Sequence, residues 1–145
     1  MPDGLARPSG TIIAFDYGLR RIGVAVGQTV TSTASVLEVV PASEKPDWQA
    51  ISLIVNEWKP AAFVVGLPLA EDGAETEMSA GARRFGRQLE GRYETPVFYQ
   101  DERLTSRGAD QRFASARSRG GMRRKDAALK DAMAAQIILE NWLQN

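Results

Sequence analysis

The stretch Thr11–Gly27, TIIAFDYGLRRIGVAVG, constrains the fold of this chain more than any other. Two apolar runs rich in β-branched residues, Thr11–Tyr17 and Ile22–Gly27, flank a short turn. This pattern predicts an antiparallel hairpin, with a positive φ at Gly18 in the turn. Asp16 lies inside the first run, where strand propensity and burial both disfavour a carboxylate. Either Asp16 caps the turn through local backbone hydrogen bonds, or it needs a donor, a cation or a metal ion.

The residue types that are absent restrict the chemistry of any active site. The sequence contains no histidine and no cysteine. Ser-His and Cys-His nucleophiles are therefore excluded, as are zinc and copper sites of the usual nitrogen and sulfur kind. A metal site in this chain must use oxygen ligands, which suit Mg²⁺ or Mn²⁺. The 18 basic and 18 acidic side chains balance, so net charge gives no information about a nucleic-acid partner.

Length and composition predict one domain. A chain of 145 residues can bury a single core, and 43% hydrophobic with 25% charged residues is typical of a soluble protein. Residues 1–10, rich in proline and glycine, are predicted to form a flexible tail, and residues 11–145 the domain. No apolar run is long enough for a membrane span or a signal peptide, so we expect a cytoplasmic protein with no membrane partner.

The rest of the chain alternates between strand and helix patterns. The predicted elements after the hairpin are a strand at 31–41, a helix at 47–59, a strand at 61–66, a helix at 78–91, a strand at 97–100, a helix at 106–114 and a final helix at 126–144. The run Ala61–Gly66 is uniformly apolar, which indicates a strand covered on both faces. Because a helix precedes it, this strand should lie parallel to the first one. The three tryptophans are expected to anchor the core.

Two further carboxylates are candidates to meet Asp16. Glu102 follows the predicted strand 97–100, at the edge where open α/β sheets bind ligands; the alternative is a solvated loop acid. Asp131 falls on the apolar face of the final helix. The residues on that face are Ala127, Ala128, Ala134, Ala135, Ile138 and Trp142.

If the three carboxylates converge, they need a counter-charge. Two carboxylates about 4 Å apart repel by about 4 kcal/mol at an effective dielectric of 20. A divalent cation removes this repulsion. One or two such ions can activate water and stabilise the attacking and leaving oxygens of a phosphodiester displacement.

A basic segment precedes the final helix. The sequence Ser115–Lys125, SARSRGGMRRK, contains five basic residues, Arg123 and Arg124 among them, and no acidic one. Its two glycines predict a flexible loop. Such a loop either binds phosphates or is a solvated run of charge, and the sequence leaves both interpretations open.

Four motifs in this order, DYGLRRIGVAVG, VVGLPLAEDG, DERLTS and DAMAAQIIL, resemble the YqgF family of pre-16S rRNA nucleases, also described as Holliday-junction-resolvase-like proteins. The resemblance covers nearly the whole chain from Thr11 onward. It implies an α/β fold of the ribonuclease H-like kind, with a five-stranded mixed sheet whose first three strands are antiparallel and with helices on both faces.

The resemblance also implies site residues. The acids that it assigns to catalysis and to the metal are Asp16, Glu102 and Asp131. It suggests that Arg21, Arg103 and Thr105 lie near the substrate or orient the acids. Apart from the resemblance, Gly18 of the turn and Arg123 and Arg124 of the basic segment are further candidates for substrate binding. One departure is Lys130, which stands where the family more usually has an apolar residue. Asp126 is therefore the alternative third ligand.

The function implied by the resemblance is a Mg²⁺- or Mn²⁺-dependent nuclease that processes the 5′ end of pre-16S rRNA during ribosome biogenesis in the cytoplasm. The expected partner is nucleic acid, pre-rRNA ahead of branched DNA, bound by a monomer or a weak homodimer. Two alternatives stay open: an endonuclease acting on branched DNA, which would need a symmetric dimer, and a non-catalytic RNA-binding module. Residue spacing alone does not separate RNA from DNA.

Overall fold

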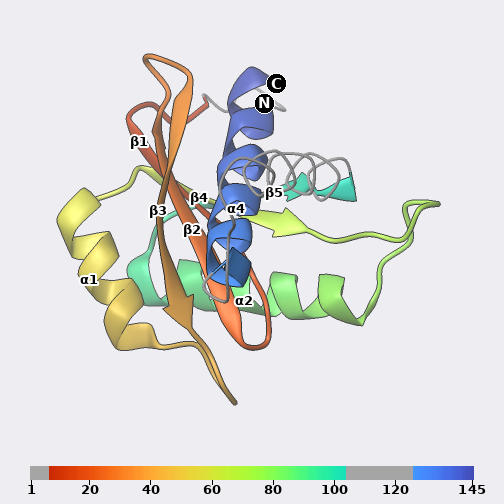
Figure 1. The fold of residues 1–145 in the computed structure, drawn as a ribbon. Helices are drawn as coiled ribbons and strands as arrows, with labels where there is room; N and C mark the ends of the chain where they lie inside the picture. Colours follow the sequence, from red (N-terminus) through yellow and green to blue (C-terminus); the bar gives the residue numbers. More distant parts are fainter. Residues whose placement is uncertain (1–6, 104–125) are drawn as a thin grey trace.

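A computed structural model describes residues 7–103 and 126–145. The elements are β1 (Thr11–Asp16), β2 (Arg21–Gln28), β3 (Thr33–Pro41), α1 (Trp48–Trp58), β4 (Ala62–Leu67), α2 (Glu77–Tyr93), β5 (Val97–Asp101) and α4 (Asp126–Gln144). The strands form one mixed sheet in the order β3-β2-β1-β4-β5 (Figure 1). The first three strands are antiparallel, whereas β4 and β5 run parallel to β1, as predicted. The predicted helix 106–114 and the basic segment 115–125 lie outside the described residues.

Helices cover both faces of the sheet, with α1 and α2 on one side and α4 on the other (Figure 1). Alternation along β1 explains the two cores. Ile13 and Phe15 join the α1 and α2 side, whereas Ile12 and Ala14 join the α4 side. Burying each of the larger side chains contributes about 1.5–3 kcal/mol. The same alternation places Asp16, the last residue of β1, on the α4 side.

The tryptophans anchor the core, as expected. Trp48 stacks on the buried ring of Phe85, with 5.6 Å between ring centroids, and Trp58 packs against the same core. Trp142 is buried in the α4 core, where its ring lies 5.5 Å from that of Phe98.

The ends of α2 differ from the prediction. We expected a helix over 78–91, but α2 begins at Glu77 and continues to Tyr93. A capping box between Thr76 and Ser79 fixes the start. Glu94, with φ of 52°, ends the helix in the left-handed conformation. Gly91 therefore lies inside α2 and does not end it, although glycine costs about 1 kcal/mol relative to alanine in a helix.

The predicted positive φ at Gly18 is wrong. Among the described glycines, only Gly10 and Gly73 have positive φ. The turn needs a glycine at position 18 for space instead, since an added Cβ would lie 2.6 Å from the carbonyl oxygen of Arg21.

The first described residues pack against the end of α4. The guanidinium of Arg7 lies 3.9 Å from the ring centroid of Trp142 and donates hydrogen bonds to the carbonyl oxygens of Trp142 and Asn145. Arg7 thereby satisfies carbonyls that a helix end leaves without a helical partner. The division into a tail of residues 1–10 and a domain of residues 11–145 stays a prediction.

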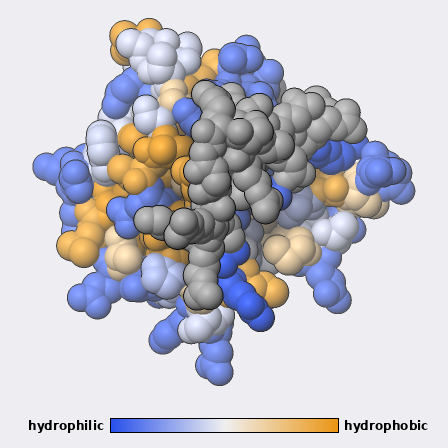
Figure 2. Space-filling model, viewed as in Figure 1, coloured by the Kyte–Doolittle hydropathy of each residue, from blue (hydrophilic) through white to orange (hydrophobic). Residues whose placement is uncertain are grey.

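Exposed apolar side chains are found on β3 and α1. Figure 2 shows a hydrophobic area on the left of the visible face, where Figure 1 places these two elements. Val36 of β3 and Leu53 of α1 are exposed. No helix within residues 7–103 and 126–145 is long and apolar enough to cross a membrane.

Candidate active site

Asp16 lies at the carboxyl end of the central strand, between two glycines. Gly23 of β2 pairs with Asp16 across the hairpin. On the other side, Gly66 of β4 follows Val65, which pairs with Phe15. The row Gly23–Asp16–Gly66 therefore crosses three strands at the edge where parallel strands end.

These two glycines make room for the other two acids. A Cβ at Gly23 would lie 2.1 Å from the carbonyl oxygen of Asp131, so α4 meets β2 by direct backbone contact. A Cβ at Gly66 would lie 2.7 Å from Oε2 of Glu102, so the Glu102 carboxyl group occupies that space. The sequence reading missed both positions. Glycine inside an apolar strand was the available signal, because it often marks close approach of another group.

Asp16 and Glu102 form a carboxyl pair with strongly perturbed acidity. Burial raises the pKa of Asp16 well above its usual value, and the charges of Glu102 and Asp131 and the hydrogen bond with Glu102 raise it further. Burial also raises the pKa of Glu102 to about 7, against the lowering effect of its hydrogen bond with Asp16; the charge of Asp101 adds to the rise. The pair therefore retains a proton close to neutral pH, as expected for two carboxyl groups in contact.

Asp131 lies beside this pair but has a different partner. Its Oδ2 accepts a hydrogen bond of 2.7 Å from Nε of Arg21, at the start of β2. Among residues 7–103 and 126–145, no group of three acids stands close enough to hold one metal ion. The structure thus places the three acids near one another, but only Asp16 and Glu102 are hydrogen-bonded to each other. The physical reason is that each is already compensated: Asp16 and Glu102 by their shared hydrogen bond, Asp131 by the Arg21 guanidinium.

The remaining predicted residues divide into those placed by the structure and those outside it. Arg103 pairs with Asp101, with Nε 2.8 Å from Oδ2, and donates to the carbonyl oxygen of Glu71 at 3.1 Å. It therefore lies at the wall of the site rather than against the acids. Gly18 lies in the turn that follows Asp16. The residues that fall outside the described part are Thr105, Arg123, Arg124 and the side chain of Asp126.

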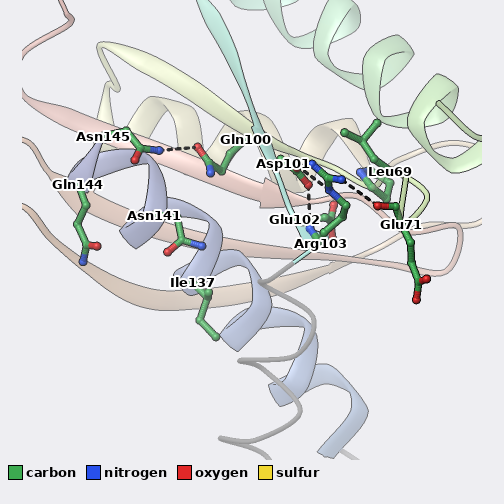
Figure 3. Close-up of a pocket in the computed structure, with 11 residues that line it drawn as sticks. Leu69, Glu71, Gln100, Asp101, Glu102, Arg103, Ile137, Asn141, Gln144 and Asn145 are labelled. Carbon is green, nitrogen blue, oxygen red and sulfur yellow. Dashed lines mark hydrogen bonds and ion pairs between the residues drawn. The ribbon is translucent and has the colours of Figure 1, made fainter. Parts of the chain in front are cut away.

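A cleft of about 950 Å³ extends from Glu102 along α4 (Figure 3). One end is formed by Glu71, Asp101, Glu102 and Arg103. Its other end carries side-chain amides, from Gln100, Asn141, Gln144 and Asn145. Sites for small ligands typically have volumes of roughly 300–1,000 Å³, so the cleft can hold a group the size of a nucleotide.

Comparison with known proteins identifies the family. Residues 10–145 match the family model described as "RuvX: Holliday junction resolvase". The chain belongs to the RuvX family.

Several relatives of this RuvX-family protein carry the same name, "Putative pre-16S rRNA nuclease". One from Hydrogenovibrio crunogenus is 48% identical over 135 residues, which are 92% of this chain and 93% of the relative. Another from Pseudomonas paraeruginosa is 46% identical over 138 residues, 94% of each chain. Among solved structures, Thermus thermophilus RuvC in complex with a Holliday junction substrate covers 93% of this chain and 94% of its own, with 19% identity and a TM-score of 0.56. That likeness confirms the α/β fold predicted from the sequence.

The pKa of Glu102 gives a testable consequence for the metal-free RuvX-family protein. The folded-state pKa of about 7 lies above the ordinary value of 4.5. The contribution of Glu102 to stability is therefore fully present below about pH 4.5 and is lost as pH rises through about 7. At about 1.4 kcal/mol per pKa unit, the loss reaches at most about 3.5 kcal/mol, or roughly 7–14 °C in Tm. The substitution Glu102→Gln should abolish this pH-dependent loss of stability.

The measurement is the Tm of wild type and Glu102→Gln in EDTA from pH 4.5 to 8.5. We expect the variant to match wild type at pH 4.5 and to exceed it at pH 8. Glu38→Gln, which removes an exposed acid from β3, should follow the wild-type pH profile. A difference between wild type and Glu102→Gln that does not change with pH would contradict the assigned acidity.

Proposed function

We propose that this RuvX-family protein is a Mg²⁺- or Mn²⁺-dependent nuclease that processes the 5′ end of pre-16S rRNA. The observation that carries the proposal is the half-buried Asp16–Glu102 carboxyl pair with Asp131 beside it, at the carboxyl edge of the sheet. Such a pair does not stabilise a protein core, since ionisation of either carboxyl group lowers the stability of the folded state. Relatives named as pre-16S rRNA nucleases over nearly their whole length support the choice of substrate.

The donor set suits a hard divalent cation. Asp16, Glu102 and Asp131 offer carboxylate oxygens only, which are the ligands that Mg²⁺ and Mn²⁺ prefer. Burial is the main cause of the raised pKa values of Asp16 and Glu102, and no arginine or lysine among the described residues lowers either of them. When bound, the ion would supply a more acidic water molecule and stabilisation of charge on the phosphate oxygens.

The chain's own residues provide the remaining functions. Asp16 and Glu102 hold a proton near neutral pH and must release it when they become ligands, so ion binding should strengthen as pH rises. Burial of the pair limits water around it and strengthens its electrostatic effects. The cleft next to Glu102 gives the substrate strand a polar wall that ends in side-chain amides.

A second candidate activity is cleavage of branched DNA, because the family description names a Holliday junction resolvase. The two activities make different demands on assembly. Cutting both strands of a junction requires a symmetric pair of sites, whereas trimming an RNA end requires one. A monomer would therefore favour RNA, and a symmetric dimer would favour branched DNA.

One experiment separates the candidates. The protein is incubated with a pre-16S rRNA 5′ fragment or a four-way DNA junction, with Mn²⁺ or with EDTA, and its mass in solution is measured. We expect cleavage of the RNA in Mn²⁺ alone and no cut in the junction. Junction cleavage by a dimer would replace the RNA proposal, and RNA binding without cleavage in either buffer would indicate a non-catalytic module.

A further inference from the structure

An ion pair between Arg21 and Asp131 links the hairpin to α4 at the candidate site. The residues are 110 positions apart in sequence, yet Nε of Arg21 donates to Oδ2 of Asp131 at 2.7 Å. The side chains are 45% and 28% exposed, respectively, so solvent reaches the pair. An exposed ion pair of this kind changes an equilibrium by about fivefold or less. It can therefore be broken cheaply.

The backbone of Asp131 is held in place, whereas its carboxylate has two groups within its reach, Arg21 and the Asp16–Glu102 pair. Direct contact with Gly23 fixes the Asp131 backbone against β2, two residues beyond Arg21. From this position the carboxylate now binds Arg21, while its charge already acts on Asp16. A change of side-chain rotamer, with no movement of α4, could redirect the carboxylate toward the Asp16–Glu102 pair.

We infer that Arg21 competes with the divalent ion for Asp131. Arg21 is the counter-ion of Asp131 in this structure and must release it before the three acids can share an ion. This inference rests on the proposed metal-dependent function and concerns how the same site is loaded. It accounts for the partial convergence of the acids, in which two carboxyl groups meet and the third is turned to an arginine.

The exchange would also give Arg21 a second role. A guanidinium released from Asp131 remains at the edge of the site with its donors exposed, and a phosphate matches their geometry. A substrate phosphate that binds Arg21 would free Asp131 for the ion. Because coupling between two ligands is reciprocal, ion binding would strengthen phosphate binding by the same factor.

The test measures Mn²⁺ affinity directly, without nucleic acid. MnCl₂ is titrated by calorimetry into metal-free wild type, Arg21→Gln, Arg21→Lys and Arg20→Gln at low salt and pH 8. We expect Arg21→Gln to bind Mn²⁺ about three- to tenfold more tightly, because it removes both the competitor and a positive charge. Arg21→Lys should fall between the two, since it keeps the charge and loses the planar donor group.

Arg20→Gln is the matched control, because it removes the same charge one residue away. Its affinity should change by less than about twofold. In 0.5 M KCl the ratio between Arg21→Gln and wild type should shrink, because salt screens an exposed pair. Thermal unfolding of each metal-free variant shows whether it is folded. If Arg21→Gln is not folded, Arg21→Lys replaces it as the test variant.

Two results would overturn the inference alone. One is unchanged or weaker Mn²⁺ binding by Arg21→Gln, and the other is an equal gain by Arg20→Gln, which would reveal only a long-range charge effect. In either case RNA cleavage by the wild type would leave the proposed function standing. Failure of the wild type and every variant to take up Mn²⁺ would remove both.

Discussion

Asp16→Asn is expected to lower cleavage of precursor rRNA by at least about a thousandfold, equivalent to about 4 kcal/mol of transition-state stabilisation. The amide keeps the shape of the side chain but removes the charge at the centre of the Gly23–Asp16–Gly66 row, where a divalent ion would bind. The same change should not harm the fold. It removes a charge that is disfavoured first by burial and then by the charges of Glu102 and Asp131, so the metal-free variant should be at least as stable as wild type at pH 8.

The measurement is single-turnover cleavage in Mn²⁺, together with Tm in EDTA at pH 8. Glu57→Gln removes one exposed acid from α1 and should change neither quantity appreciably. Wild-type cleavage by purified Asp16→Asn would exclude this site as the catalytic centre. A large drop in Tm would show instead that Asp16 serves the fold.

Gly23→Ala is expected to have the largest effect on stability of any single-methyl addition at this site. The new Cβ would lie 2.1 Å from the carbonyl oxygen and 2.5 Å from the carbonyl carbon of Asp131. Neither is a flexible side-chain atom, so α4 itself must move away from β2. We expect a loss of about 2–4 kcal/mol, since overpacking against backbone is relieved only by shifting a whole element. Because Asp131 moves with α4, cleavage should also fall by about a hundredfold.

Gly91→Ala is the control for this substitution. Gly91 lies near the end of α2, and an added Cβ there has no neighbour within 4 Å. Replacing it should therefore stabilise the protein by up to about 1 kcal/mol through helix propensity alone. Urea unfolding of the two variants should give changes of opposite sign. Equal stability of Gly23→Ala and wild type would disprove the backbone contact between β2 and α4.

Local patterns in the sequence predicted most of the fold. The bounds of α4 match the prediction residue for residue, because its apolar face and its polar flanks are both encoded locally. The uniformly apolar run at β4 indicated a central strand, and β4 does lie between β1 and β5. Position 18 shows the limit of such rules. The glycine suggested a left-handed turn residue. The actual constraint is space, because the carbonyl oxygen of Arg21 lies too close to position 18 for a Cβ atom.

The sequence predicted which acids belong to the candidate site, but not how their side chains are arranged. The position of Asp131 on an apolar helix face marked it as unusual, and the structure does place its charge next to Asp16. Its pairing with Arg21 depends on two elements 110 residues apart, and no local pattern reports such a contact. The same holds for Gly66, whose lack of a side chain matters only because Glu102 and Ile138 arrive there from later segments.

The position of α4 in chain order has a consequence for biosynthesis. All five strands precede α4, which packs along the sheet and carries Asp131. A nascent chain emerging from the ribosome therefore exposes the apolar side of its sheet, with Ile12, Ala14 and Val64 uncovered, until α4 has been made. Asp131 can join Asp16 and Glu102 only at that stage. An incomplete nascent chain, which stays close to ribosomal RNA throughout translation, would therefore lack a complete active site.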